Sequence, residues 1–150
     1  MKKYIINEDT IALIKKNNST LIIEDKRKLL ITKKLLTILD ESCKFYGSNY
    51  KGRITAISEL INSKYKTPIL INEISSLIFF PTGSLRNENV MYFNYKKIIK
   101  YDEFYGIIRI YLSNNIMLTS KISKYSLNEQ LLKCLLINNI LYSRKNRENL

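Results

Sequence analysis

The apolar residues of this sequence follow two different spacings, and the change from one to the other constrains the fold most strongly. In residues 4–32, short runs at Tyr4–Ile6, Ile11–Ile14 and Leu21–Ile23 are separated by polar turn clusters. This pattern is typical of a small antiparallel meander. From Ser48 the apolar residues recur every three or four positions, which predicts a helix with Ser48 as its N-cap. The sequence therefore predicts an α+β fold: antiparallel strands with a central helix after residue 48.

The second half of the chain continues this mixture. The apolar runs Ile69–Ile71 and Leu77–Phe80 predict strands, and Gly106–Leu112 with Ile116–Ile122 predicts a hairpin that turns through residues 113–115. Pro and Gly are rare, at two and four residues, and no linker or repeat is visible. We therefore expect a single domain that spans residues 1–150.

A C-terminal amphipathic helix completes the expected fold. Ser126 and Glu129 have the spacing of a capping box, in which each side chain satisfies a free backbone N–H of the other residue. The apolar face that follows contains Leu127, Leu131 and Leu135, with Leu132, Leu136 and Ile140 beside them. Such a face must pack on the sheet or on another subunit.

The charge balance favours an anionic partner. Lys and Arg number 25 against 13 for Asp and Glu, which gives a formal net charge of +12. An A+T-rich genome raises the Lys content by codon bias, but this bias does not explain why acidic residues are scarce. The excess indicates a polyanion such as nucleic acid, or an anionic membrane surface.

Several classes of site are disfavoured by what the sequence lacks. It contains no His, the commonest general base and metal ligand. Cys43 and Cys134 lie far apart, too few to build a zinc site, so we expect two buried, unpaired thiols in a reducing cytosol. The acidic pairs at 40–41 and 102–103 accompany no catalytic motif. We expect no enzyme activity, no catalytic residue, no metal and no cofactor.

No run reaches the ~18 apolar residues of a membrane span, so we expect a cytoplasmic, nucleoid-associated protein with no membrane partner.

The segment Asp40–Arg53 is the most unusual part of the sequence. It contains three aromatic residues, two glycines and the cations Lys44, Lys51 and Arg53, in what we interpret as a turn that opens a helix. Cations in a first helical turn oppose the helix dipole by ~0.3–1 kcal/mol each, and Gly52 costs about 1 kcal/mol more than Ala. An anion bound at the helix N-terminus would reverse the first cost. Alternatively, the helix begins after Gly52 and these residues are ordinary loop cations.

The same segment carries a family resemblance. The run SCKFYGSNYKGR at Ser42–Arg53, followed by Pro68–Ile71 and Ile78–Thr82, resembles the ComK family of competence transcription factors from low-GC Gram-positive bacteria. The resemblance continues through Ser126, Leu127 and Gln130 and covers residues 4–142. Members of the family often carry a Trp and a His after the second of these segments, where this chain has Met91 and Asn94.

The resemblance implies an activator of competence (DNA uptake) genes that binds paired A/T-rich boxes of double-stranded DNA, largely through the minor groove. It also implies dimers that assemble into a tetramer, and an adaptor that delivers the protein to a Clp protease. Longer members carry a C-terminal extension used for adaptor recognition. Because this chain stops soon after its last expected helix, adaptor-driven turnover by that route is less expected.

We take Lys44, Lys51, Arg53 and Arg86 as the candidate DNA-binding residues. Arg86 lies in the polar segment 83–89 between expected strands, where it either enters the narrow, electronegative minor groove of A/T-rich DNA or remains a solvated loop cation.

Two alternative functions stay open beside DNA activation. The first is single-strand binding, in which the tyrosines between positions 92 and 111, interleaved with cations, stack on unpaired bases. The second is a shortened homologue that pairs through its last helix with a full-length activator and modulates it.

Overall fold

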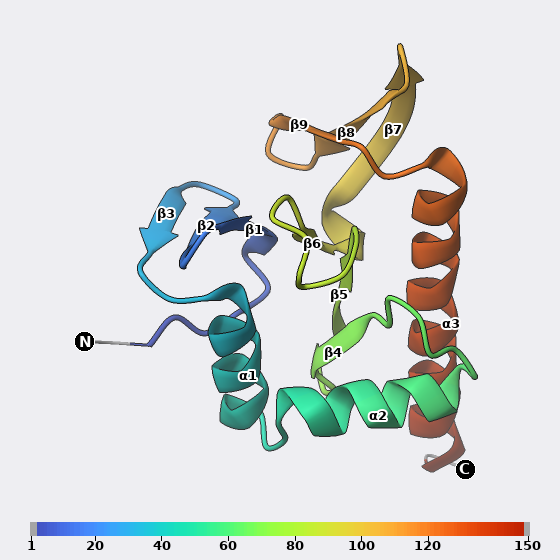
Figure 1. Cartoon of the computed structure of the whole chain (residues 1–150). Helices are drawn as coiled ribbons and strands as arrows, with labels where there is room; N and C mark the ends of the chain where they lie inside the picture. Colours follow the sequence, from blue (N-terminus) through green and yellow to red (C-terminus); the bar gives the residue numbers. More distant parts are fainter. Residues whose placement is uncertain (1–2, 149–150) are drawn as a thin grey trace.

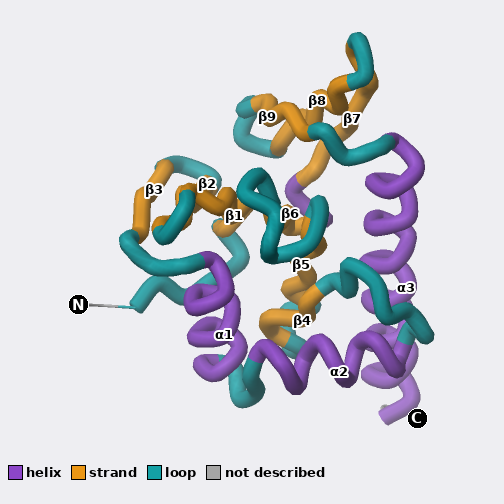
Figure 2. Tube along the Cα trace, in the orientation of Figure 1, coloured by secondary structure: helices purple, strands orange, loops and turns teal. Residues whose placement is uncertain are grey.

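The computed structural model describes residues 3–148, in which strands and helices alternate as an α+β protein. In chain order the elements are β1 (Thr10–Lys16), β2 (Ser19–Glu24), β3 (Lys28–Ile31), α1 (Leu35–Phe45), α2 (Tyr50–Leu60), β4 (Ile69–Asn72), β5 (Leu77–Pro81), β6 (Met91–Asn94), the 3-10 turn η1 (Tyr95–Lys97), β7 (Ile98–Phe104), β8 (Ile107–Leu112), β9 (Met117–Ser120) and α3 (Lys124–Glu148). In Figure 2 the helices lie below the strands and along their right side. The expected fold class is confirmed.

The strands form two antiparallel sheets. Sheet A has the order β3-β2-β1-β6-β5-β4, and sheet B has the order β7-β8-β9. In Figure 1, α1 lies at the left below β1–β3, α2 crosses the bottom, α3 runs along the right side, and the β7–β8 hairpin projects at the top. The expected strands at residues 69–71 and 77–80 and the expected hairpin of β8 and β9 are all confirmed.

Sheet A is buried on both faces, which explains why β5 is a continuous apolar run. Leu77 and Phe79 point to one side, where they pack with the buried face of α1. Ile78 and Phe80 point to the other side, where sheet B and α3 cover them. Because both hydrophobic clusters share sheet A, the described residues form one domain, and any two sites on α1 and on sheet B lie on opposite sides of that sheet.

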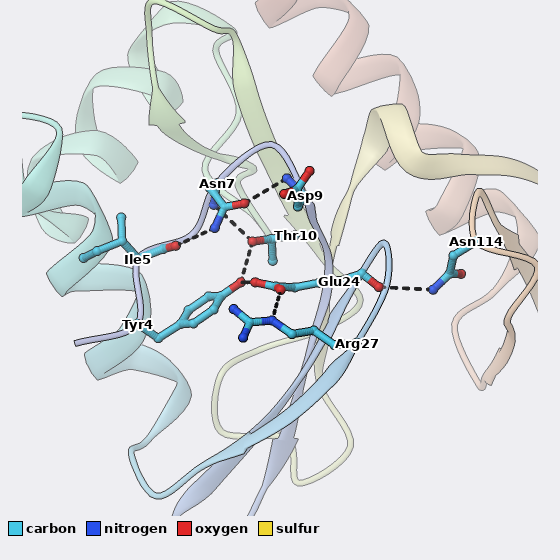
Figure 3. A network of polar contacts seen from close by, with 8 residues as sticks. All are labelled: Tyr4, Ile5, Asn7, Asp9, Thr10, Glu24, Arg27 and Asn114. Carbon is cyan, nitrogen blue, oxygen red and sulfur yellow. Dashed lines mark hydrogen bonds and ion pairs between the residues drawn. The ribbon is translucent and has the colours of Figure 1, made fainter. Parts of the chain in front are cut away.

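The N-terminal meander differs from the expected one by a shift along the chain. Residues Tyr4–Ile6 are not a strand, and the third strand is instead Lys28–Ile31. Tyr4 is held by side-chain contacts: its hydroxyl donates a hydrogen bond to the buried carboxylate of Glu24, which also pairs with Arg27 (Figure 3). Burial pushes the pKa of Glu24 up, but the hydrogen bonds from Arg27 and Tyr4 outweigh it, so the pKa is lowered. This network fixes the segment without a strand ladder.

Three helix predictions need correction. The first part of the segment interpreted as a turn, residues 40–45, is helical, because Leu35, Ile38, Leu39, Ser42 and Cys43 form one buried stripe and define α1. The N-cap of α2 is Asn49 rather than Ser48. The long last helix begins at Lys124, and the Ser126 N–H donates to the Ser123 hydroxyl at 3.0 Å. Ser123 therefore caps α3, and Ser126 lies inside the helix.

Candidate nucleic-acid interface

The residues between α1 and α2, with their flanking cations Lys44, Lys51 and Arg53, form what we call the basic turn. Helix α1 ends in a Schellman motif: the Ser48 N–H donates to the Cys43 carbonyl at 3.0 Å and the Gly47 N–H to the Lys44 carbonyl at 3.1 Å. This motif needs a left-handed residue after the helix, and Gly47 has a φ of +92°. The first glycine of the segment therefore has a local structural role.

The second glycine belongs to the N-cap of α2. The Asn49 side chain accepts a hydrogen bond from the Gly52 N–H at 2.6 Å, and a Cβ at position 52 would lie 2.9 Å from Asn49 Oδ1. The Tyr50 N–H donates to Asp40 Oδ1 at 2.9 Å. The alternative in which the helix begins after Gly52 is therefore wrong. Two of the amides that the anion hypothesis requires already have partners within the chain.

The three cations of the basic turn have different surroundings. Lys44 pairs with Asp40 at 2.9 Å, with 63% and 31% of the two side chains exposed; such an exposed pair is worth little and exchanges readily. Lys51 is exposed and is absent from the ion pairs of residues 3–148. Arg53 is half-buried, and its Nε is buried without a hydrogen-bond partner. Lys51 is thus the most accessible cation of the turn.

Arg86 lies in the loop between β5 and β6, and the preceding Leu85 packs against the hydrophobic cluster under α1. The Thr82 N–H donates to the Met91 carbonyl at 2.9 Å, and Lys15 Nζ donates to the Leu85 carbonyl at 2.7 Å; both bonds hold this loop in place. Arg86 itself is exposed. Its neighbours Ser84 and Asn87 line a groove between the two sheets, on the side of sheet A opposite to α1.

Four lysines of this groove were not singled out by the sequence. Lys15, Lys16, Lys66 and Lys121 all line it, but they come from three separate parts of the chain. A local motif search has no signal that would join them, because only the packing of sheet B and α3 onto sheet A brings them together. Met91 and Asn94, where members of the family often carry a Trp and a His, are both buried. Met91 also lines the groove.

The tyrosines considered for base stacking do not form one platform. Tyr92 is 2% exposed in sheet A, whereas Tyr105 at the tip of the β7–β8 hairpin is 90% exposed. Lys100 already covers the ring of Tyr111, with Nζ 5.0 Å from its centroid. Arg109 lies 4.6 Å from the Phe104 centroid and is paired with Asp102. The cations and aromatic rings of sheet B thus contact one another.

Both cysteines are buried and free, as expected. Cys43 belongs to the cluster under α1 and Cys134 to the cluster under α3, so sheet A separates them. Burial raises the pKa of the Cys43 thiol to about 11 and also raises that of Cys134. Both groups therefore remain thiols near neutral pH.

Comparison with known proteins identifies one family. The sequence model of the ComK protein family matches residues 1–146. A competence transcription factor of Bacillus subtilis is 32% identical over 88 residues, which cover 56% of this chain and 46% of that protein. The chain thus matches about half the length of this relative. No solved structure matches the chain. In the part of the chain that the structure describes, the helices are too short or too polar to cross a membrane.

Proposed function

Because the chain belongs to the ComK protein family, we propose that it is a DNA-binding transcription factor that activates competence genes. The observation that carries this proposal is the family match over residues 1–146. A formal net charge of +12 supports it, because a basic domain of this size suits a polyanionic partner. The proposed target is A/T-rich double-stranded DNA, whose narrow minor groove attracts Arg and Lys.

The proposed contacts are the four cations that the sequence singled out. Lys51 and Arg86 are exposed, and Lys44 can exchange Asp40 for a phosphate because that pair is exposed. Arg53 is the least accessible of the four, since it is half-buried. Phosphate contacts of this kind position the protein, whereas sequence preference requires a cation that enters the minor groove.

Gel-shift titration of the full chain tests the proposed function. Promoter DNA with paired A/T boxes serves as the target, and a scrambled G+C-rich duplex of equal length serves as the control. We expect tighter binding to the A/T boxes and a steep loss of affinity with rising salt. Equal or absent binding to both duplexes would contradict the proposal, and tighter binding to single strands would favour the alternative single-strand function.

We further propose that the protein forms oligomers through α3. The leucines expected on one apolar face of this helix fall into two groups in the structure. Leu127 is buried against the sheets, whereas Leu132, Leu135 and Leu136 are 59%, 47% and 45% exposed. These three leucines form an apolar stripe on the side of α3 away from the core. Leu135→Asp should therefore give a folded monomer by circular dichroism and light scattering. A folded variant of unchanged mass would contradict this interface.

The same leucine stripe supports the second function. If the protein modulates a full-length activator, this stripe would contact the longer relative instead of a second copy. Two results together would favour this function. The wild type alone would fail to bind promoter DNA, and it would capture a purified full-length homologue that the Leu135→Asp variant does not capture.

A further inference from the structure

A basic groove opens between sheet A and sheet B. Its volume is about 810 Å³, and its walls come from the end of β1, the β5–β6 loop, β8 and β9, and the N-terminal end of α3. Four lysines line it, together with hydroxyl and carboxamide side chains from Thr82, Ser84, Asn87, Asn89, Thr119, Ser120, Ser123 and Ser126. No Asp or Glu is among these lining residues. Glu88, between two of them, is exposed.

The four lysines are not used in ion pairs among the side chains that the structure describes, those of residues 3–147. Lys15 holds the β5–β6 loop through the Leu85 carbonyl, and Lys66 Nζ lies 5.1 Å from the Tyr65 ring centroid. Lys16 and Lys121 are exposed. Like charges that gather at one hollow repel one another, and an anionic ligand removes this cost.

The other groups of the groove suit phosphate oxygens. Hydroxyl and carboxamide side chains donate hydrogen bonds to phosphate without sequence preference. Ser123 and Ser126 place the positive end of the α3 dipole at the groove wall, which adds to the field of the lysines. Thus the groove offers the cations and hydrogen-bond donors that a phosphate chain requires, with no facing carboxylate.

We propose that this basic groove binds the phosphodiester backbone of duplex DNA; the inference rests on the proposed DNA-binding function and assigns its surface. A DNA backbone fits better than a small phosphate compound because Lys16 and Lys121 come from two different segments and are exposed to solvent rather than enclosed. Arg86 lies in the loop that forms one wall.

The test compares three double variants of the full chain by fluorescence anisotropy with labelled A/T-box duplex over a range of salt. Lys16→Ala with Lys121→Ala removes two groove charges. Lys26→Ala with Lys28→Ala removes two exposed charges at the other end of β2 and is the matched control. Lys16→Arg with Lys121→Arg keeps the groove charges. Circular dichroism verifies that each variant is folded, as expected for exposed positions.

Loss of two phosphate contacts should lower the log–log salt slope by about 2 units in the groove alanine variant. The control and the arginine variant should keep the wild-type slope. Equal slopes in the groove variant and the control would overturn the inference, whereas a wild type that binds no duplex would overturn the proposed function itself.

A second arm separates DNA from a small phosphate ligand, with inorganic pyrophosphate as the probe in thermal unfolding. We expect DNA binding to need the groove lysines whether or not pyrophosphate stabilises the wild type. Stabilisation by pyrophosphate that is lost in the groove variant, combined with an unchanged DNA salt slope, would overturn the DNA assignment in favour of a small phosphate compound.

Discussion

The basic turn and the basic groove are both cationic, and they differ in how their charges are used. The turn is contiguous in sequence, and much of its polar chemistry is satisfied internally: Asp40 bonds both Lys44 and the Tyr50 N–H. The groove is built from separate segments, and its lysines have no carboxylate partner in the described residues. A conspicuous sequence motif can thus serve to join two helices through local hydrogen bonds rather than to contact a ligand.

The two regions also lie on opposite sides of sheet A. The turn follows α1, which packs on one face, and the groove lies between the other face and sheet B. One side of a straight duplex therefore meets one region of a given protomer. The salt dependence of DNA binding therefore tests which of the two regions contacts the DNA phosphates.

The largest expected effect is on that salt dependence. The quadruple variant Lys16→Ala, Lys121→Ala, Lys51→Ala and Arg53→Ala should lower the log–log salt slope by about 4 units if both regions neutralise phosphates, and by about 2 units if the groove acts alone. Fluorescence anisotropy at several salt concentrations measures this difference. A quadruple variant with the wild-type slope would contradict DNA binding by either region.

The second prediction concerns how the groove is held together. Gln130 of α3 is 2% exposed, and its Nε2 donates to the Lys66 carbonyl at 2.9 Å and to the Pro81 carbonyl at 2.8 Å. Gln130→Ala leaves both carbonyls without this donor and should reduce the free energy of unfolding by roughly 2–4 kcal/mol. Urea unfolding measures the loss.

Asn128→Ala is the control for this variant, because Asn128 is exposed on the same helix and should change stability by less than ~0.5 kcal/mol. Equal stability of the two variants would mean that Gln130 does not hold α3 beside the groove.

The sequence predicted strands correctly at the apolar runs 69–71 and 77–80 and at the hairpin of β8 and β9. It was wrong at the apolar run Tyr4–Ile6, which side-chain hydrogen bonds hold in place of a strand ladder. It failed at the helix starts because polar caps occur close together: Ser48 and Asn49 are both good cap residues, and only the tertiary position of Asp40 favours the second. Ser126 fits a capping box, yet Ser123 begins the helix three residues earlier. Local patterns therefore locate a helix but do not choose among adjacent caps.

The candidate site was predictable only in part, for a physical reason. Arg86 was placed in a polar loop between strands, and the structure has it there. The groove that its loop helps to line depends on the docking of sheet B and α3, which places Lys16 and Lys121, about a hundred residues apart in sequence, on the walls of one groove. Charges that meet only through such packing leave no periodic signal.

The third prediction tests the structural role of the basic turn by the pH dependence of the free energy of unfolding. The hydrogen bond from the Tyr50 N–H, followed by that from Lys44, lowers the pKa of Asp40 below its ordinary value of 3.8. A lowered carboxyl pKa stabilises the fold fully above the ordinary pKa, and this stability is lost as the pH falls through the lowered value. Asp40→Ala should cost about 1 kcal/mol at pH 7 and less once the carboxyl is protonated, because a neutral carboxyl is the weaker hydrogen-bond acceptor.

Urea unfolding at a series of pH values measures this difference, with Glu88→Ala as the control, since Glu88 is exposed and absent from the ion pairs of residues 3–148. A cost for Asp40→Ala that stays constant down to acid pH would contradict the contact between Asp40 and α2.

The smallest effect is expected from the two cysteines, one in each hydrophobic cluster. Cys43 packs under the helix that leads to the basic turn, and Cys134 packs under α3. The thiolate is the reactive form of cysteine, and a pKa of about 11 at Cys43 leaves ~1 thiol in 10⁴ ionised at pH 7. Reductant and oxidant should therefore leave the salt slope of the wild type unchanged, like that of the Cys43→Ala, Cys134→Ala variant. A slope that responds to oxidant in the wild type alone would show that one buried thiol becomes exposed and controls its neighbouring region.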